Sequence, residues 1–275
     1  MDMFFKISYP LIMRIDGKAI QEEILHSLGT NLTGKKVAFV QLCDDTVTDK
    51  FVKAKLKVAQ RLGVEAKHIH LRPVTTEDAS KGLFEVYQSG YDGVVIQLPL
   101  PDDIDTMTIL SSIPKNLDID LLNPESMHDF VEKKTSMVPP VAEAVRSILT
   151  KVAPDLTSKK ITILGKGRLV GLSVASLFDR DAIPYSIFDK DSNEEEVRRA
   201  LEGSDIVITG IGRAGLVTPD MIKEGALLID AGTSEQSGIL LGDIDPACYT
   251  KAKAYTPVPG GVGPITIATL FKNLQ

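Results

Sequence analysis

The stretch that decides the fold is KKITILGKGRLVG, residues 159–171. A short apolar run at residues 161–164 leads into Gly165, Gly167 and Gly171 and then into a segment of helical character. This order predicts a strand, a tight turn and a helix N-terminus, where glycines without Cβ atoms let backbone N–H groups approach the pyrophosphate of a dinucleotide. The spacing is GxGxxxG, and such loops also occur as plain tight turns, so the surrounding sequence has to decide between the two.

Strand and helix patterns alternate on both sides of this loop. Such alternation indicates parallel sheets covered by helices, and 275 residues suffice for two α/β domains joined near residue 140. The expected strands are residues 36–42, 66–71, 93–98, 161–164, 185–188, 206–209 and 227–230, and the expected helices are residues 16–28, 47–62, 76–88, 140–152 and 265–272.

Composition and charge exclude several classes of function. The net charge is −6 with both signs interspersed, so no nucleic-acid surface is expected. The two cysteines and four histidines show no metal-ligand spacing, which predicts no metal site and fits a reducing cytoplasm. Residues 1–12 are apolar but contain Lys6 and Pro10 and are too short to span a bilayer, so we expect an N-terminal extension or first strand, and no membrane partner.

Lys55 is the one cation on the apolar side of the helix predicted at residues 47–62. It falls in the stripe formed by Phe51, Val58 and Leu62. A lysine held there loses hydration, which lowers its pKa and suits it to act as an acid, a base or an electrostatic partner. The alternative is that its ammonium reaches solvent at a domain edge.

Three further segments do not fit a purely structural role. Gln97 lies near the carboxyl end of a buried strand, where α/β sheets place ligands, although it could simply bond a neighbouring loop. Asp118 and Asp120 share a short loop that is either ligand-facing or a solvated turn. The stiff loop YTPVPGGVGP, residues 255–264, is either a connection or one wall of a cleft.

The segment TPVPGGVGP, residues 256–264, resembles a signature of the bifunctional methylenetetrahydrofolate dehydrogenase/methenyltetrahydrofolate cyclohydrolase family. The resemblance runs from about Ile15 to the C-terminus and includes DGVVIQLPLP, FVKAK, IVITGIG, DAG and GDID. It implies an α/β fold with an N-terminal folate-binding, catalytic domain at residues 1–139, a Rossmann NAD(P)-binding domain at residues 140–264 and a cleft between them. It also implies that a C-terminal helix, residues 265–275, returns to the first domain, and that the chain forms a cytoplasmic homodimer.

The implied chemistry is oxidation of 5,10-methylenetetrahydrofolate by NADP or NAD, followed by hydrolysis of the methenyl product to 10-formyltetrahydrofolate. By position, Lys55 acts at the one-carbon bridge, Gln97 orients it and Asp118 holds the pterin ring. The resemblance assigns folate contacts to Phe51, Ile96, Leu98, Pro259, Gly260, Gly261, Val262 and Gly263. It assigns the dinucleotide to Gly165, Lys166, Gly167, Arg168, Gly171, Asp189, Lys190 and Thr233.

Several departures from the family bear on function. Phe51 replaces a tyrosine and removes a hydroxyl beside Lys55. Of the two activities, hydrolysis is the one more affected by this loss. The family's DVDG is matched to residues 116–119, which keeps Asp118 but loses a carboxylate and a glycine. A monofunctional dehydrogenase, a relative redirected to another substrate and a catalytically silent nucleotide-binding dimer are therefore the alternatives.

The residues beyond the second strand of the Rossmann domain bear on the coenzyme. Asp189 stands where an acidic residue binds a free ribose 2′-hydroxyl, which favours NAD. Lys166, Arg168 and Lys190 favour the 2′-phosphate of NADP, the coenzyme usual in the family. The balance is a slight preference for NAD, which holds only if the Asp189 side chain faces the ribose.

Overall fold

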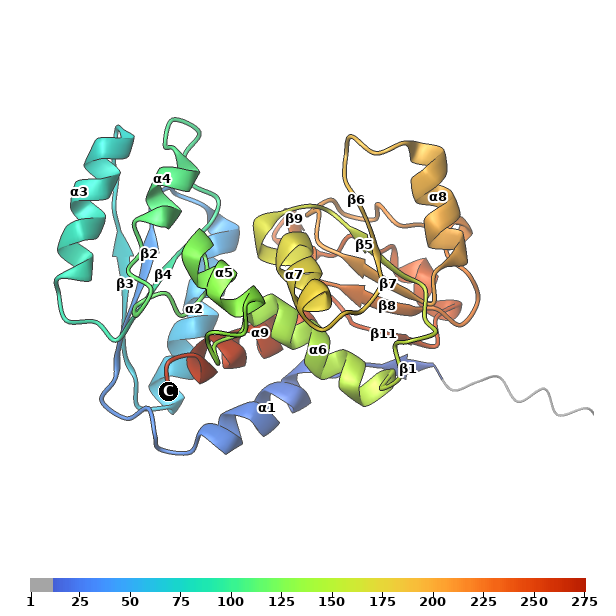
Figure 1. The fold of residues 1–275 in the computed structure, drawn as a ribbon, viewed down its shortest axis with the longest axis horizontal. Coiled ribbons are helices and arrows are strands. Elements are labelled where there is room, and N and C mark those ends of the chain that lie inside the picture. The colour runs from blue at the N-terminus through green and yellow to red at the C-terminus, as the bar shows by residue number, and fades with distance from the viewer. Residues whose placement is uncertain (1–11) are drawn as a thin grey trace, which may run out of the picture.

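The computed structural model describes residues 12–275 and contains two parallel sheets on opposite sides of a group of helices (Figure 1). The extension or first strand predicted at residues 1–12 lies outside the described residues except for Ile12. Within the described part of the chain, no helix has both the length and the hydropathy that a membrane span requires.

The first sheet has the strand order β3-β2-β4, with every pair parallel. Its two faces are buried by different side chains of β2, because successive residues of a strand point to opposite sides. Val37 and Phe39 face one core cluster, and Ala38 and Val40 face another. The elements of this half are β2 (Lys36–Gln41), α2 (Thr46–Arg61), β3 (Glu65–His70), α3 (Thr76–Tyr87), β4 (Gly93–Ile96), α4 (Thr106–Ser111) and α5 (Pro124–Val131).

The second sheet has the parallel order β1-β11-β8-β7-β5-β6. The order in which the chain adds strands reverses at β5, because β6 lies on one side of it and β7 on the other. Sheets of α/β proteins bind ligands at such a switch point. Its elements are β1 (Met13–Arg14), β5 (Ile161–Leu164), α7 (Ser173–Arg180), β6 (Ser186–Phe188), α8 (Glu194–Gly203), β7 (Ile206–Thr209), β8 (Leu227–Asp230) and β11 (Ala254–Tyr255). A short antiparallel pair, β9 (Ser234–Gln236) and β10 (Ile239–Leu241), follows β8.

Three helices connect the two halves: α1 (Gly17–Leu28), α6 (Pro140–Val152) and α9 (Val262–Lys272). Helix α9 packs against both α1 and α6 (Figure 1). Its Ile265 belongs to the core beside the second sheet, whereas Phe271 contacts Phe39 of β2 edge to face, with ring centroids 6.5 Å apart. Because α9 is buried on two sides, it is apolar almost all round.

One element boundary and one strand pairing differ from expectation. Helix α9 begins at Val262, three residues before the predicted start, because Pro264 falls in its first turn, where proline is tolerated. Strand β1 pairs with β11, so the chain enters through the second sheet before it builds the first. The domain bounds of 1–139 and 140–264 stay a prediction.

Candidate active site

Lys55 and Gln97 meet at the carboxyl end of β4. Lys55 Nζ donates to Gln97 Oε1 over 2.7 Å, and Gln97 Nε2 donates to the carbonyl oxygen of Val95 over 3.0 Å. The second bond fixes which end of the Gln97 amide faces the lysine, and Gln97 is itself buried. The Lys55 ammonium also lies 5.7 Å from the centroid of the Phe39 ring. The lysine therefore points inward, and the alternative in which it reaches out to solvent is wrong.

The ammonium of Lys55 is balanced by the carboxyl group of Asp120. Burial lowers the pKa of Lys55, and the charge of Asp120 raises it in part. Burial raises the pKa of Asp120 to about 7, although the charge of Lys55 opposes this rise. The pKa values of both groups thereby lie closer to neutral pH than those of free lysine and aspartate, which suits proton transfer.

The structure contradicts the assignment of Asp118 to the ligand-facing position. Asp118 is only 1% exposed, and its carboxylate accepts hydrogen bonds from the backbone N–H groups of Leu122 and Asn123, at 3.0 and 2.9 Å. It thus fixes the turn into α5, while Asp120, two residues later, is the carboxylate whose charge acts on Lys55. The sequence could not separate the two, because a carboxylate bound to the backbone and one facing a ligand look alike in a loop.

The backbone at Leu121 corrects the register of this segment. Leu121 has a φ of 53°, in the left-handed region that favours glycine. The family's DVDG therefore fits residues 118–121 rather than 116–119. Both carboxylates are then retained as Asp118 and Asp120, and the glycine alone is lost.

The loop before α9 faces Phe51 of α2. A Cβ atom at Gly263 would lie 3.9 Å from Cε1 of Phe51, so the first turn of α9 approaches the aromatic ring closely. The loop is held from behind by α1, where the N–H of Gly17 donates to the carbonyl oxygen of Gly260 over 3.0 Å. A Cβ at Gly17 would overlap the carbonyl oxygen of Gly261, so this approach requires glycine. Phe51 and the loop that precedes α9 form two sides of one site.

The other predicted folate contacts divide between surface and core. Leu98 is half-buried and Pro259 is exposed, so both can meet a ligand. Ile96 is 1% and Val262 4% exposed, and each packs in a core cluster. The side chains of Ile96 and Val262 therefore support the neighbouring residues, and the assignment of these two residues to the folate site stays a prediction.

The glycine loop after β5 packs tightly against the turn after β7. Gly165 has a φ of 101°, and a Cβ there would lie 2.9 Å from the carbonyl oxygen of Gly210. A Cβ at Gly171 would overlap the carbonyl oxygen of Gly165, whereas Gly167 meets nothing closer than 3.7 Å. The predicted helix starts with one π-helical turn, Arg168–Leu172, before α7. The loop is thus closed on its inner side and open at Gly167, as a pyrophosphate cradle requires.

Two buried aspartates, from the DAG and GDID segments, hold the turns beside this loop. Asp243 accepts three backbone N–H bonds, at 2.7–2.9 Å, from Ile211, Gly212 and Arg213. Asp230 accepts from the hydroxyl of Thr209 and from the N–H of Gly232, both at 3.0 Å. Burial raises the pKa of Asp230 to about 6. Thr233 follows this second turn, and its carbonyl oxygen lies 3.4 Å from the position of a Cβ on Gly212.

The charged residues predicted to contact the ribose fall in different places. Asp189 follows β6, and its carboxylate lies 3.1 Å from Lys166 Nζ and accepts a 3.0 Å bond from the hydroxyl of Ser192. These partners lower the pKa of Asp189.

Arg168 turns the other way, toward Met107 and the narrow cleft that Asp120 also lines. Lys190 is exposed. The loop thus brings Lys166 to the Asp189 side and Arg168 to the side of the first sheet.

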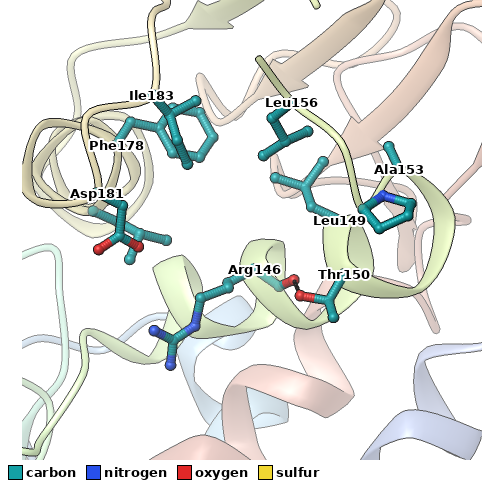
Figure 2. A pocket seen from close by; sticks show the side chains of 10 residues that line it. Arg146, Leu149, Thr150, Ala153, Leu156, Phe178, Asp181 and Ile183 are labelled. Carbon is teal, nitrogen blue, oxygen red and sulfur yellow. Dashed lines mark hydrogen bonds between the residues drawn. The ribbon is translucent and has the colours of Figure 1, made fainter.

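A second hollow, between α6 and α7, is separate from this arrangement. Figure 2 shows Arg146 and Asp181 at its rim and Leu149 and Phe178 among its apolar walls. None of the predicted site residues lines it. The candidate active site is therefore the junction of the two sheets. Here α2, β4 and the loop that carries Asp120 meet the glycine loop after β5 and the start of α9.

Comparisons with known proteins agree with this geometry. The catalytic-domain model of the tetrahydrofolate dehydrogenase/cyclohydrolase family matches residues 15–120, and the NAD(P)-binding-domain model of that family matches residues 139–275. A bifunctional protein FolD of Mycoplasmopsis synoviae is 34% identical over 247 residues, which cover 87% of each chain. FolD 2 of Lactobacillus johnsonii is 32% identical over 259 residues, covering 92% of this chain and 89% of the relative.

Solved structures extend the likeness to three dimensions. The methylenetetrahydrofolate dehydrogenase-cyclohydrolase of Trypanosoma brucei, complexed with NADP and an inhibitor, has a TM-score of 0.87 at 28% identity and covers 96% of both chains. The NAD-dependent enzyme of Saccharomyces cerevisiae, at 16% identity and a TM-score of 0.75, shares the fold. The second half of the chain is accordingly a domain that binds a nicotinamide dinucleotide. The chain belongs to the tetrahydrofolate dehydrogenase/cyclohydrolase family.

Proposed function

We propose that this protein oxidises 5,10-methylenetetrahydrofolate to 5,10-methenyltetrahydrofolate with NAD(P) and then hydrolyses the product to 10-formyltetrahydrofolate. The observation that carries the proposal is the Lys55–Gln97 hydrogen bond of 2.7 Å beside Asp120, at the junction where the glycine loop faces the first sheet. The family membership supports both activities, since the relatives at 34% and 32% identity are bifunctional proteins.

The residues of the first half hold and orient the folate in this proposal. Asp120 accepts N–H groups of the pterin, because within residues 12–275 its carboxyl group has no backbone partner, whereas that of Asp118 has two. The ring of Phe51 stacks on the ligand opposite Gly263. This division gives folate binding to the first sheet and its loops, and dinucleotide binding to the second.

The dinucleotide fits the second half because Gly165 and Gly171 close the loop inward and Gly167 leaves its outer side open. When bound, the nicotinamide accepts the hydride from the one-carbon bridge. Lys55 positions the water that attacks the methenyl carbon and takes part in the proton transfers, since desolvation lowers its pKa. Gln97 holds the lysine in place through an amide that is fixed by Val95.

The coenzyme preference follows from the Asp189–Lys166 pair. Asp189 keeps its place at the end of β6, which supports NAD, but Lys166 offsets part of its charge. We therefore infer a modest preference for NAD with measurable use of NADP. The homodimer and the cytoplasmic location stay predictions.

A second candidate, a monofunctional dehydrogenase, is favoured by Phe51. This side chain has no hydroxyl with which to assist Lys55 in hydrolysis. Redirection to another substrate loses its main basis, because Asp118 and Asp120 retain both carboxylates of the DVDG segment. The inward-facing Lys55–Gln97 pair argues against a silent nucleotide-binding protein, which would gain nothing from a desolvated lysine.

Absorbance at the reduced-nicotinamide and methenyl-folate bands tests these candidates, with purified protein, methylenetetrahydrofolate and either coenzyme. We expect reduced coenzyme to form without accumulation of methenyl product, faster with NAD than with NADP. Accumulating methenyl product would establish the monofunctional enzyme instead. Absence of reduction with both coenzymes would refute the proposed function.

A further inference from the structure

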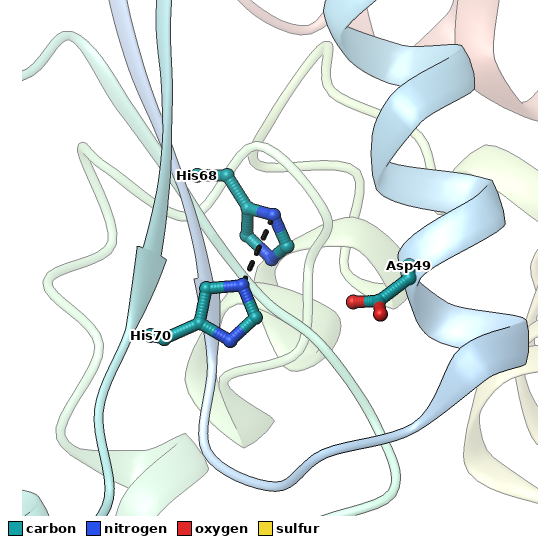
Figure 3. Close-up of side chains that lie close together, drawn as sticks. All are labelled: Asp49, His68 and His70. Atoms are coloured by element: carbon teal, nitrogen blue, oxygen red, sulfur yellow. Dashed lines mark hydrogen bonds between the residues drawn. The ribbon is translucent and has the colours of Figure 1, made fainter.

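Outside the candidate active site, Asp49, His68 and His70 gather on one side of the first sheet. The two histidines alternate along β3 and so share the face that α2 covers, while Asp49 reaches toward them from the first turns of α2 (Figure 3). Each residue offers one ligand atom, and these atoms all lie within 4.8 Å of one another. The spacing of the histidines in the sequence did not point to this group, because its third member comes from a different element.

The distance between the two imidazoles matches that of metal ligands. His70 Nε2 and His68 Nδ1 are 3.3 Å apart. In a tetrahedral site with Zn–N bonds of about 2.0–2.1 Å, two ligand nitrogens are separated by about 3.3–3.4 Å. The exposed ring of His70 has room to turn its lone pair toward the same point.

A buried glutamine orients the inner histidine. Gln41 is 1% exposed, and its Nε2 donates to the carbonyl oxygen of Cys43 over 2.8 Å. Its Oε1 must then accept from His68 Nε2, also over 2.8 Å, which leaves Nδ1 of His68 unprotonated on the side of His70. Metal-binding histidines usually have an outer partner of this kind, which sets the tautomer.

The third group is an anion in the first turn of α2. Within residues 12–275, the Asp49 carboxylate takes part in no hydrogen bond or salt bridge, and its ligand atom lies near those of the two histidines. It contributes the negative charge that a divalent cation requires. The three residues leave the remaining coordination positions to water, because His70 is exposed and the other two are half-buried.

We propose that Asp49, His68 and His70 bind one divalent first-row transition metal ion of the zinc class, clamping α2 to the edge strand β3. Two imidazoles and one carboxylate are typical ligands for such ions and a poor match for calcium or magnesium, which take mostly oxygen ligands. None of its residues belongs to the folate or dinucleotide site described above, although the charge of Lys55 reaches His68 and lowers its pKa.

Calorimetric titration of tag-free, chelator-treated full-length protein with zinc chloride tests the proposal. We expect one ion per chain, a visible absorption band when cobalt(II) replaces zinc, and a higher unfolding temperature with zinc. His70→Gln should weaken zinc binding at least tenfold, the lower end of the effect seen when even an outer-shell partner is lost. His26→Gln, in an exposed position on α1, is the matched control and should bind like the wild type.

Asp49→Asn is the second test variant if His70→Gln does not fold. It preserves the size of the side chain and removes only the anionic ligand. The unfolding temperature of each variant without metal shows whether it is folded. Zinc affinity that is equal in the wild type, His70→Gln and Asp49→Asn would overturn the proposal, as would the absence of saturable binding by the wild type.

Discussion

The two sides of the candidate active site are built in different ways. On the folate side, Lys55, Gln97 and Asp120 are side chains brought together from α2, the end of β4 and a loop, and their pKa values depend on burial. On the dinucleotide side, the surface is mostly backbone, and the buried carboxylates of Asp230 and Asp243 serve to hold turns in place.

This difference teaches where chemistry and binding are encoded. Proton transfer needs titratable groups in a low-dielectric setting, so it depends on a few side chains. Pyrophosphate binding needs N–H groups at close range, so it depends on glycines and on the residues that shape the backbone. Substitutions on the folate side should therefore act on rate, and those on the dinucleotide side should act on stability and coenzyme affinity.

The largest expected effect is that of Lys55→Met. Methionine keeps the length of the side chain and removes the ammonium, so hydrolysis of supplied methenyltetrahydrofolate should fall by about 100-fold or more. The Michaelis constant for coenzyme should stay unchanged, because Lys55 lies on the folate side. Lys53→Met, on the exposed face of the same helix, is the control and should retain full activity. Hydrolysis within a few-fold of wild type would remove Lys55 from the mechanism.

Asp243→Asn tests the dinucleotide side. The carboxylate of Asp243 accepts from three backbone N–H groups, and the amide nitrogen of asparagine cannot accept. At least one of these bonds is therefore lost, which should lower the free energy of unfolding by about 1–3 kcal/mol. The Michaelis constant for coenzyme should rise, while hydrolysis of supplied methenyltetrahydrofolate by the folded variant stays near wild type. Denaturant unfolding and the two assays measure these effects, with the exposed Asp181→Asn as control. A loss of hydrolysis equal to the loss of coenzyme use would break the comparison.

Lys166→Met should have the smallest effect and sharpens the coenzyme inference. Without its ammonium, the carboxylate of Asp189 repels a 2′-phosphate more strongly, so kcat/KM with NADP should fall about two- to fivefold relative to NAD. Lys159→Met, an exposed lysine before β5, should leave the ratio unchanged. An unaltered ratio in Lys166→Met would mean that the pair does not face the ribose.

The match between prediction and structure is best where a pattern is local. Strands β5, β7 and β8 begin and end at the predicted residues, because continuous apolar runs mark buried parallel strands. Helix α9 starts earlier than predicted, because its first turn contains glycine and proline, which also mark turns. Helical periodicity placed Lys55 on the apolar side of its helix but left open whether its ammonium reaches solvent, and the bond to Gln97, 42 residues away, shows that it points inward.

The sequence by itself determined the strand–glycine–helix segment, the two α/β halves and the misplaced lysine, because periodicity and turn chemistry act over a few residues. Only the tertiary structure decided that Asp118 binds backbone N–H groups while the charge of Asp120 acts on Lys55, that Lys166 pairs with Asp189 and that Asp49 joins His68 and His70. Each of these depends on the crossing of separate elements. The residue type at a position does not record which group lies opposite it, and packing of the whole chain makes that choice.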